Sequence, residues 1–415
     1  MKSKRSPSWL EMTVLSKRNC KFNSISSLDS KLQPNIRCTL ALRSKRDFYE
    51  IFNQTEKTML FENYTARNLP LQNRIVMSPM TRSRAVQDNT PNALMAQYYA
   101  QRASAGLIVT EGTSPSPNGL GYARIPGLFN QAQIDGWKLV TSAVHAKGGK
   151  IVVQLMHTGR VSHVSNLPQG AEVLSPTAEV CPGEMYSDSL GMQAHSAPRV
   201  MTQADIEHAI GEFKQASLNA IAAGFDGVEI HAANGYLIEQ FLNANVNTRT
   251  DAYGGSAAAR NKFTLDILKS VSHAIGADKV GIRISPHGAF NNTGAFEGVD
   301  QQYLDLVKEI SNMGLLYLHV LDHSAMGAPA VPVELKQQLK SLFKGPFILA
   351  GGYERASAEK AISDGQADLI GFGRPFISNP DLVQRMKTNA ALTAPDMSTF
   401  YTADAIGYTD YPELA

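Results

Sequence analysis

Cysteine is scarce in this chain: its 415 residues include three, Cys20, Cys38 and Cys181, and no two of them form a C-x-x-C pair. Their number and spacing exclude a disulfide framework and a thiolate zinc site. They are typical of a reducing compartment, so we expect a cytoplasmic protein. No run approaches the roughly 18 apolar residues that a membrane helix requires. We therefore expect a soluble chain without a membrane partner.

An excess of one charge is also missing, since 39 Lys and Arg stand against 37 Asp and Glu. Residues 1–58 hold twelve basic and five acidic side chains, whereas residues 59–415 hold 27 and 32. A mildly acidic body argues against nucleic acid as a partner. Residues 1–58 lack the apolar segment of a secretory signal. We interpret them as a basic, disordered N-terminal extension, with an organelle transit peptide and an upstream start codon as alternatives.

From residue 74 onward, short apolar runs alternate with amphipathic segments, a pattern that predicts βα units and a parallel sheet buried on both faces. The candidate strands are eight: 74–80, 105–112, 150–157, 226–233, 279–286, 315–322, 345–352 and 367–374. Eight consecutive βα units predict an α/β fold, a TIM (β/α)8 barrel, for residues 59–415. The rival is a doubly wound open sheet, but no G-x-G-x-x-G follows the first strand.

Two segments between these strands carry further signals. The stretch of about 158–200 is too long for an ordinary βα loop, which predicts a lid or small subdomain after the third strand. Residues 202–225 repeat apolar side chains at helical spacing. Thr202 and Asp205 at their start predict a capping box.

In such a barrel the active site forms at the carboxyl ends of the strands. No lysine lies at these ends, which excludes a Schiff-base aldolase. Gly351-Gly352 and Gly373-Arg374 end the last two strands, where barrels often bind phosphate through glycine-exposed backbone N–H groups and a guanidinium. The alternative is that the glycines only permit tight turns and that Arg374 joins a surface ion pair.

The segment H231-A-A-N234-G-Y236 ends the fourth strand and offers two neutral hydrogen-bond donors followed by a phenol. Such donors can stabilise a developing enolate oxygen, and a tyrosine can protonate the adjacent carbon. The alternative is an Asn-Gly turn beside a core histidine. Histidines at strand ends also permit a metal-dependent barrel hydrolase. This class fits poorly, because the first strand has no H-x-H and the nearby carboxylates form no ligand pattern, so we expect no metal.

These segments, in their order and spacing, resemble the old yellow enzyme family of FMN-dependent ene reductases, closest to its bacterial N-ethylmaleimide and pentaerythritol tetranitrate reductase type. The resemblance runs from about Met59 to the C-terminus. Its matching segments include N73-R-I-V-M-S-P-M-T-R82, Q154-L-M-H-T-G-R160, E229-I-H-A-A-N-G-Y-L237, N247-T-R-T-D-A-Y-G-G-S256 and G371-F-G-R-P-F-I-S-N-P-D-L382.

The resemblance implies bound FMN, with each contact assigned by position. Thr81 and Gln154 would meet the flavin pyrimidine edge, and Arg283 the N1/O2 region, where reduced flavin gathers negative charge. The isoalloxazine would lie against Pro79, Met80 and Gly112, and the phosphate against Gly351, Gly352, Gly373 and Arg374.

It also implies that NADPH or NADH first reduces FMN in the same pocket, so that turnover is ping-pong, with hydride leaving flavin N5 for an electron-poor alkene. His231 and Asn234 would bind the carbonyl oxygen of the alkene, and Tyr236 would protonate its α-carbon. Tyr122, Met156 and Tyr401 would line the substrate pocket. Met156 stands where many relatives have tryptophan, which predicts a larger pocket.

We therefore expect an NAD(P)H-dependent oxidoreductase that reduces α,β-unsaturated carbonyl compounds, with nitroesters or quinones as further acceptors. The chain would act as a monomer or homodimer. A flavoprotein that binds small ligands without turning over alkenes is a second alternative to the metal-dependent hydrolase.

Overall fold

The computed structural model describes residues 58–414. Our interpretation of residues 1–58 as an extension falls, apart from Thr58, outside the described residues and stays a prediction.

The described residues form a closed barrel of eight parallel strands, one within each range that the sequence predicts. The last strand pairs with the first, Gly371 opposite Val76, so the barrel has no free edge. All eight strands are buried on both faces, which explains their unbroken apolar sequences. They are β3 (Ile75–Met77), β4 (Leu107–Val109), β5 (Ile151–Leu155), β10 (Gly227–Ala232), β11 (Val280–Ile284), β12 (Tyr317–Leu321), β13 (Phe347–Ala350) and β14 (Leu369–Phe372).

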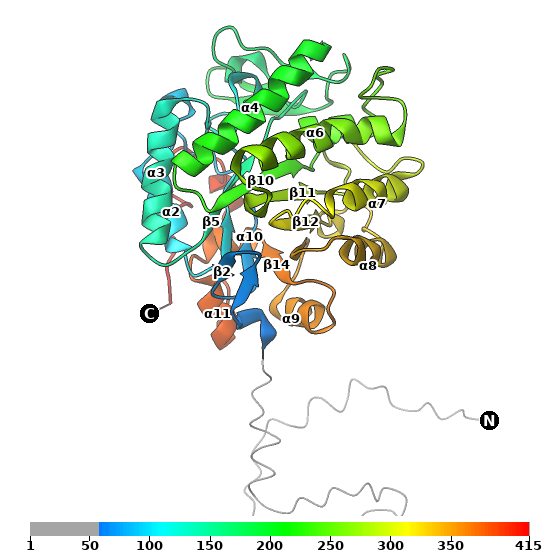
Figure 1. Cartoon of the computed structure of the whole chain (residues 1–415). Coiled ribbons are helices and arrows are strands. Elements are labelled where there is room, and N and C mark those ends of the chain that lie inside the picture. Colours follow the sequence, from blue (N-terminus) through cyan, green and yellow to red (C-terminus); the bar gives the residue numbers. More distant parts are fainter. Residues whose placement is uncertain (1–57, 415) are drawn as a thin grey trace, which may run out of the picture. The chain divides into compact units, whose positions relative to one another are not determined.

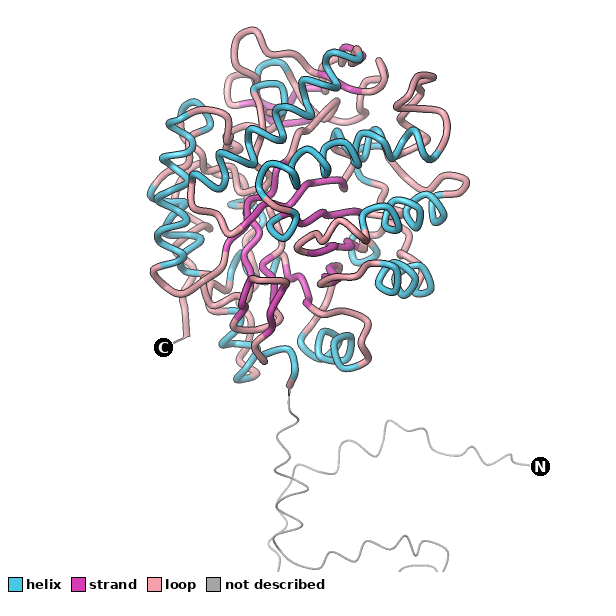
Figure 2. Tube along the Cα trace, in the orientation of Figure 1, coloured by secondary structure: helices cyan, strands magenta, loops and turns pink. Residues whose placement is uncertain are grey.

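Helices surround the strands, as the helical layer outside the central strands shows (Figures 1 and 2). The predicted capping box opens the longest helix, since Asp205 N–H donates to Thr202 Oγ1 and Thr202 N–H to Asp205 Oδ2. The helices are α2 (Ala93–Gln101), α3 (Gln131–His145), α4 (Gln203–Ala222), α5 (Leu237–Leu242), α6 (Ala257–Ile275), α7 (Val299–Ile310), α8 (Val333–Leu342), α9 (Arg355–Ser363), α10 (Arg374–Ser378) and α11 (Leu382–Thr388).

Three small sheets complete the fold. The hairpin of β1 (Tyr64–Ala66) and β2 (Leu69–Leu71) packs against the apolar barrel residues Val76 and Leu107. In segment 158–200, β6 (Leu174–Ser175) pairs with β9 (Arg199–Val200), and β7 (Glu184–Ser187) forms an antiparallel hairpin with β8 (Gly191–Ala194). The segment is therefore a structured excursion from the barrel, as expected from its length.

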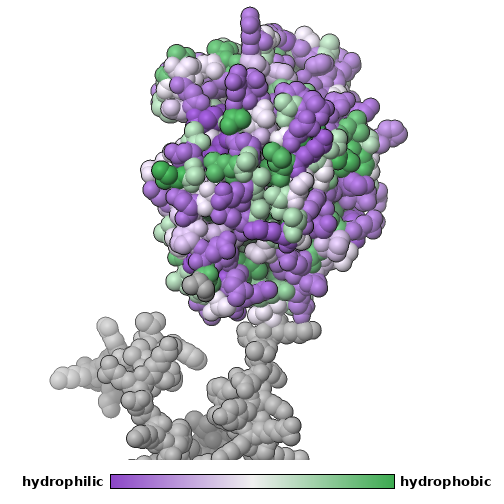
Figure 3. Space-filling view, turned by 90° about the vertical axis from the view of Figure 1, so that its left-hand side faces the viewer, coloured by the Kyte–Doolittle hydropathy of each residue, from purple (hydrophilic) through white to green (hydrophobic). Residues whose placement is uncertain are grey.

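The surface of the described residues is mostly polar on the face drawn in Figure 3, where hydrophilic residues cover most of the area and hydrophobic ones lie between them. Within residues 58–414, no helix is both long enough and apolar enough to cross a membrane.

Candidate active site

A cavity of about 1320 Å³ lies at the carboxyl ends of the strands, where the barrel fold places active sites. Residues that follow each of the eight strands contribute to its wall, and so does the C-terminal segment 398–403. Its volume exceeds the roughly 300–1,000 Å³ of an ordinary small-ligand site. The cavity therefore has room for a large cofactor together with a second molecule.

One side of the cavity is formed by the glycines that follow β13 and β14. Gly351 and Gly352 have φ angles of 135° and 72°, which other residues rarely adopt. A Cβ at Gly351 would lie 2.2 Å from the carbonyl oxygen of Asp322, so a side chain cannot be placed there. Gly373 and Arg374 line the same cavity from the neighbouring strand. The exposed guanidinium of Arg374 has no hydrogen-bond or ion-pair partner in the part of the chain described, so the surface ion pair considered above is not formed.

The end of β10 supplies neutral hydrogen-bond donors to the site. Ala233 N–H donates to Nδ1 of His231 at 3.3 Å, which leaves the proton of a neutral imidazole on Nε2. Nδ2 of Asn234 lies 3.4 Å from that Nε2. Burial, together with nearby Arg283, holds the pKa of His231 well below its usual range, so the ring is neutral. Two donors at this spacing can share one acceptor oxygen.

Asn234 takes the left-handed backbone conformation, with φ of 61°, and Gly235 follows with 73°. The Asn-Gly turn considered from the sequence is therefore present. The turn also brings Asn234 and Tyr236 to the cavity, since both residues line it. Two residues that follow β11 hold the backbone of this turn: Asn234 N–H donates to Ser285 Oγ at 3.0 Å, and Asn291 Nδ2 donates to the Asn234 carbonyl at 2.7 Å.

Tyr236 places its phenol in the cavity beside a second one. The hydroxyls of Tyr236 and Tyr122 lie 3.1 Å apart, and the Tyr236 ring meets the His231 ring edge-on at 5.1 Å. Burial raises the pKa of Tyr236 to about 12 and that of Tyr122 well above its ordinary value. Both phenols therefore keep their protons at neutral pH.

Arg283 brings a positive charge to the cavity from β11, where it pairs in register with His231. It is 5% exposed, and its Nε has no partner in residues 58–414. The hydroxyl of Ser78, also on the cavity wall, is buried and likewise has no partner in the described residues.

Glu229, on β10, accepts hydrogen bonds from Gln154 Nε2 and His319 Nδ1, each at 2.8 Å. Burial alone would raise the pKa of Glu229, but His319 and Arg283 lower it, so the carboxylate stays ionised.

The cavity wall includes most of the predicted residues: Pro79, Met80, Thr81, Tyr122, Asn234, Tyr236, Arg283, Gly351, Gly352, Gly373, Arg374 and Tyr401. Gly112, Gln154, Met156 and His231 are buried and are not among the lining residues. Met156 packs with Leu120 and Ile125, and its sulfur fills the space that a Cβ at Gly112 would need. The cavity residues Tyr122 and Tyr236 pack against the same apolar cluster, and the contact between Met156 and substrate stays a prediction.

Several cavity residues, among them Tyr186, Met192, Phe290 and Met326, were not assigned from the sequence, whereas Tyr401 was assigned to the substrate pocket. An apolar rim of exposed side chains lines the cavity, consisting of Tyr186, Met192, Phe290, Met326 and Tyr401. Arg124 connects two parts of this rim, because its guanidinium pairs with Asp188 in the β7–β8 turn and donates to the Tyr401 carbonyl at 2.7 Å. His323, directly after β12, donates toward Asn234 Oδ1 at 2.8 Å. The one sequence signal that pointed to His323 as a site residue was its position shortly after a strand.

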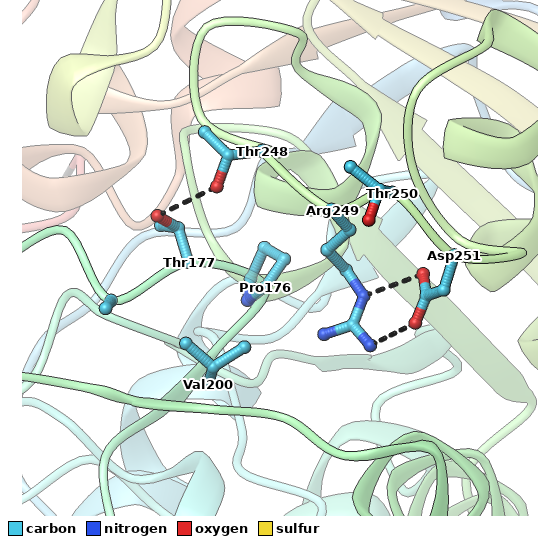
Figure 4. A pocket seen from close by; sticks show the side chains of 8 residues that line it. Pro176, Thr177, Val200, Thr248, Arg249, Thr250 and Asp251 are labelled. Atoms are coloured by element: carbon cyan, nitrogen blue, oxygen red, sulfur yellow. Dashed lines mark hydrogen bonds and ion pairs between the residues drawn. The ribbon is translucent and has the colours of Figure 1, made fainter.

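A second cavity, of about 410 Å³, lies between segment 176–178 and segment 248–251 (Figure 4). Its one guanidinium, that of Arg249, is paired with the Asp251 carboxylate and also donates to the carbonyl of Met201. It therefore offers no free charge to a ligand. No group of three or more His, Cys, Asp or Glu side chains within residues 58–414 is arranged to hold a metal ion.

Comparison with known proteins gives one consistent result. The profile of the family described as "NADH:flavin oxidoreductase / NADH oxidase family" matches residues 59–393. 12-Oxophytodienoate reductase 7 of Oryza sativa subsp. japonica is 40% identical over 378 residues, covering 86% of this chain and 94% of the relative. Chanoclavine-I aldehyde reductase of Penicillium roqueforti is 41% identical over 365 residues, covering 85% and 96%. Among solved structures, morphinone reductase matches with a TM-score of 0.82 and 41% identity, over 86% of this chain and 96% of that one.

Proposed function

Because this chain belongs to the NADH:flavin oxidoreductase / NADH oxidase family, the old yellow enzymes, and is an FMN-dependent ene reductase, we propose that it reduces the C=C bond of α,β-unsaturated carbonyl compounds with His231, Asn234 and Tyr236. The observation that carries this proposal is the donor pair of His231 Nε2 and Asn234 Nδ2, 3.4 Å apart, beside the protonated phenol of Tyr236. The closer tie to bacterial N-ethylmaleimide reductases stays a prediction.

The residues of the cavity fit FMN. Arg283 Nε is a buried donor without a partner in residues 58–414, as an electron-rich flavin edge requires, and the glycines after β13 and β14 line the same cavity as Arg374, where a phosphate would bind. FMN, when bound, supplies hydride transfer from a reduced nicotinamide to the substrate. We assign the phosphate to Gly351, Gly352, Gly373 and Arg374, and the ring system to Pro79, Met80, Thr81, Gly112, Gln154 and Arg283.

The donor pair would act on the substrate oxygen. Two N–H groups that converge on a carbonyl oxygen draw electron density from the conjugated C=C bond, which makes its β-carbon a hydride acceptor. They also stabilise the negative charge that develops on that oxygen as the hydride arrives. Both groups are neutral and already in place, so no proton needs to move at this stage.

Tyr236 would complete the reaction. Saturation of the double bond requires a proton at the α-carbon, and the Tyr236 hydroxyl holds one in the cavity. The Tyr122 hydroxyl, 3.1 Å away, would stabilise the phenolate that this transfer leaves by donating a hydrogen bond, until a proton from solvent restores the Tyr236 phenol. A protein that only bound ligands would not need this donor.

The apolar rim supports a preference for substrates with an apolar body larger than a single small ring. Its five side chains expose aromatic and thioether surface around the cavity, next to the polar donors. The carbonyl end would enter toward Asn234 while the apolar body covers the rim. Nitroesters and quinones would be further acceptors.

The same cavity would also serve NADPH or NADH before the alkene enters, so the kinetics would be ping-pong. The sparse cysteines support a cytoplasmic location, since Cys181 is a free thiol.

An anaerobic visible spectrum tests the function. The purified protein is recorded alone, after NADPH, and after 2-cyclohexen-1-one. A flavin band that bleaches with NADPH and returns with the enone supports both half-reactions. Bleaching without return favours a ligand-binding or other-acceptor role, and a missing flavin band after FMN is supplied contradicts the cofactor assignment.

A further inference from the structure

The amide of Asn234 lies between two histidines. Its Nδ2 is 3.4 Å from His231 Nε2, and its Oδ1 is 2.8 Å from His323 Nε2. His323 lies in the segment that follows a different strand, β12, and is 2% exposed while lining the same cavity. Asn234 is thus in hydrogen-bond contact with a residue 89 positions later in the chain.

The orientation of this amide decides its chemistry. An asparagine amide has a donor end and an acceptor end. With Nδ2 beside His231, the amide donates to a substrate oxygen. After rotation by half a turn, Oδ1 would face that oxygen and repel it. Nothing in Asn234 itself favours one orientation, so a neighbour must select it.

His323 can select it only as a donor. Its Nδ1 is buried without a partner in the described residues. A buried N–H without a partner is rarer in proteins than an unused acceptor lone pair, so the proton belongs on Nε2, which faces Asn234 Oδ1. Burial lowers the pKa of His323 to about 4, with Arg283 contributing, so the neutral ring carries this single proton at pH 7.

The ring is also held in place. Phe290 packs against it at 4.6 Å, and the position of a Cβ on Gly288 would lie 2.9 Å from His323 Nδ1, so the backbone passes close to that side of the ring. The neighbouring backbone of Asn234 is fixed by Ser285 and Asn291. The remaining freedom of Asn234 is therefore rotation of its amide.

We propose that His323 is a positioning residue of the ene reductase, which holds the Asn234 amide with Nδ2 toward the substrate carbonyl through the Nε2–H···Oδ1 hydrogen bond. This inference rests on the proposed function, because it concerns the same donor pair. It adds a residue that acts through Asn234 without supplying a proton or an electron to the substrate.

The test compares His323→Phe, His323→Gln and the neighbouring control Ser324→Ala, each in the wild type and in Asn234→Ala. His323→Phe keeps a ring but loses the donor, and we expect kcat/KM for 2-cyclohexen-1-one to fall about 10- to 100-fold, the usual effect of one such hydrogen bond. His323→Gln retains an N–H and should recover most of the loss. Ser324→Ala should behave as wild type.

The Asn234→Ala background separates positioning from general damage. There, His323→Phe should cause no further loss, because the group that it orients is gone. Flavin content and melting temperature should match wild type in the single variants. The inference is overturned if the losses caused by His323→Phe and by Asn234→Ala multiply in the double variant. It is also overturned if His323→Phe alone leaves kcat/KM unchanged. Failure of the wild type to reduce the enone overturns the proposed function instead.

Discussion

The carboxylate of Glu239 accepts the backbone N–H of Gly235 at 2.6 Å. Ser285 Oγ and the Tyr303 hydroxyl donate to the same carboxylate at 2.9 and 3.2 Å. Since Gly235 stands between the proposed catalytic residues Asn234 and Tyr236, this buried acid fixes the turn that carries them. It is at the same time an ionisable group in the core.

This burial predicts a pH dependence of stability. Desolvation raises the pKa of Glu239 to about 7, above its ordinary value, so the folded state binds the proton more tightly than the unfolded state. The stabilisation is complete below about pH 4.5 and is lost as pH rises through 7, by up to about 3 kcal/mol. Glu239→Gln should remove this slope in urea unfolding between pH 5 and 8.

The matched control for that series is Glu359→Gln, because Glu359 also accepts two backbone N–H groups, those of Met59 and Leu60. It should keep the wild-type slope. If Glu239→Gln keeps that slope too, Glu239 is not the group that titrates.

Tyr236→Phe should separate the two half-reactions. Loss of a positioned proton donor typically costs about 10²- to 10⁴-fold, and we expect this loss in reoxidation by 2-cyclohexen-1-one, measured by stopped flow. Reduction by NADPH should be little changed. Because the pKa of Tyr236 is about 12, the wild-type reoxidation rate should show no Tyr236 titration between pH 6 and 9. Tyr64→Phe, in the β1–β2 hairpin, is the control, and equal losses in both half-reactions would argue against a proton-donor role.

Arg374→Ala tests the phosphate site. The wild type should bind FMN more tightly than riboflavin, and the variant should lose about 10- to 100-fold of FMN affinity while its riboflavin affinity stays constant. Fluorescence titration of the apoprotein with each flavin measures this difference. Arg355→Ala, on the adjacent α9 and not among the cavity-lining residues, should retain the wild-type preference. A parallel loss for both flavins would place the phosphate elsewhere.

The apolar rim predicts a dependence on substrate size. In a series of 2-cyclohexenones with longer alkyl chains, kcat/KM should rise by about threefold or fourfold per added buried CH₂ until the rim is covered. The double variant Tyr186→Ser/Met192→Ser should flatten this rise and leave the unsubstituted ring nearly unaffected. A wild-type series with no dependence on chain length would show that the rim does not contact substrate.

The barrel could be predicted from the sequence because strands buried on both faces appear as unbroken apolar runs, and because Thr202 and Asp205 mark a helix start locally. The convergence of Gly351, Gly352, Gly373 and Arg374 on one cavity could be predicted because β13 and β14 are neighbours in the barrel, and their phosphate role stays a prediction. Each of these inferences needs only local pattern and chain order.

The contacts of His323 and Met156 could not be predicted in the same way. His323 meets Asn234 across β11, and the meeting depends on how two loops bend after their strands. Met156 fills space left by Gly112, Leu120 and Ile125, which is a matter of three-dimensional volume. Sequence spacing contains neither kind of information.

The β7–β8 hairpin contributes Tyr186 and Met192 to the rim but no strand to the barrel. Its replacement would leave the donor pair, the phenol and the glycines after β13 and β14 on their own strands. On the proposed function, exchange of this hairpin as a module would change which molecules enter the cavity and leave the reacting groups in place.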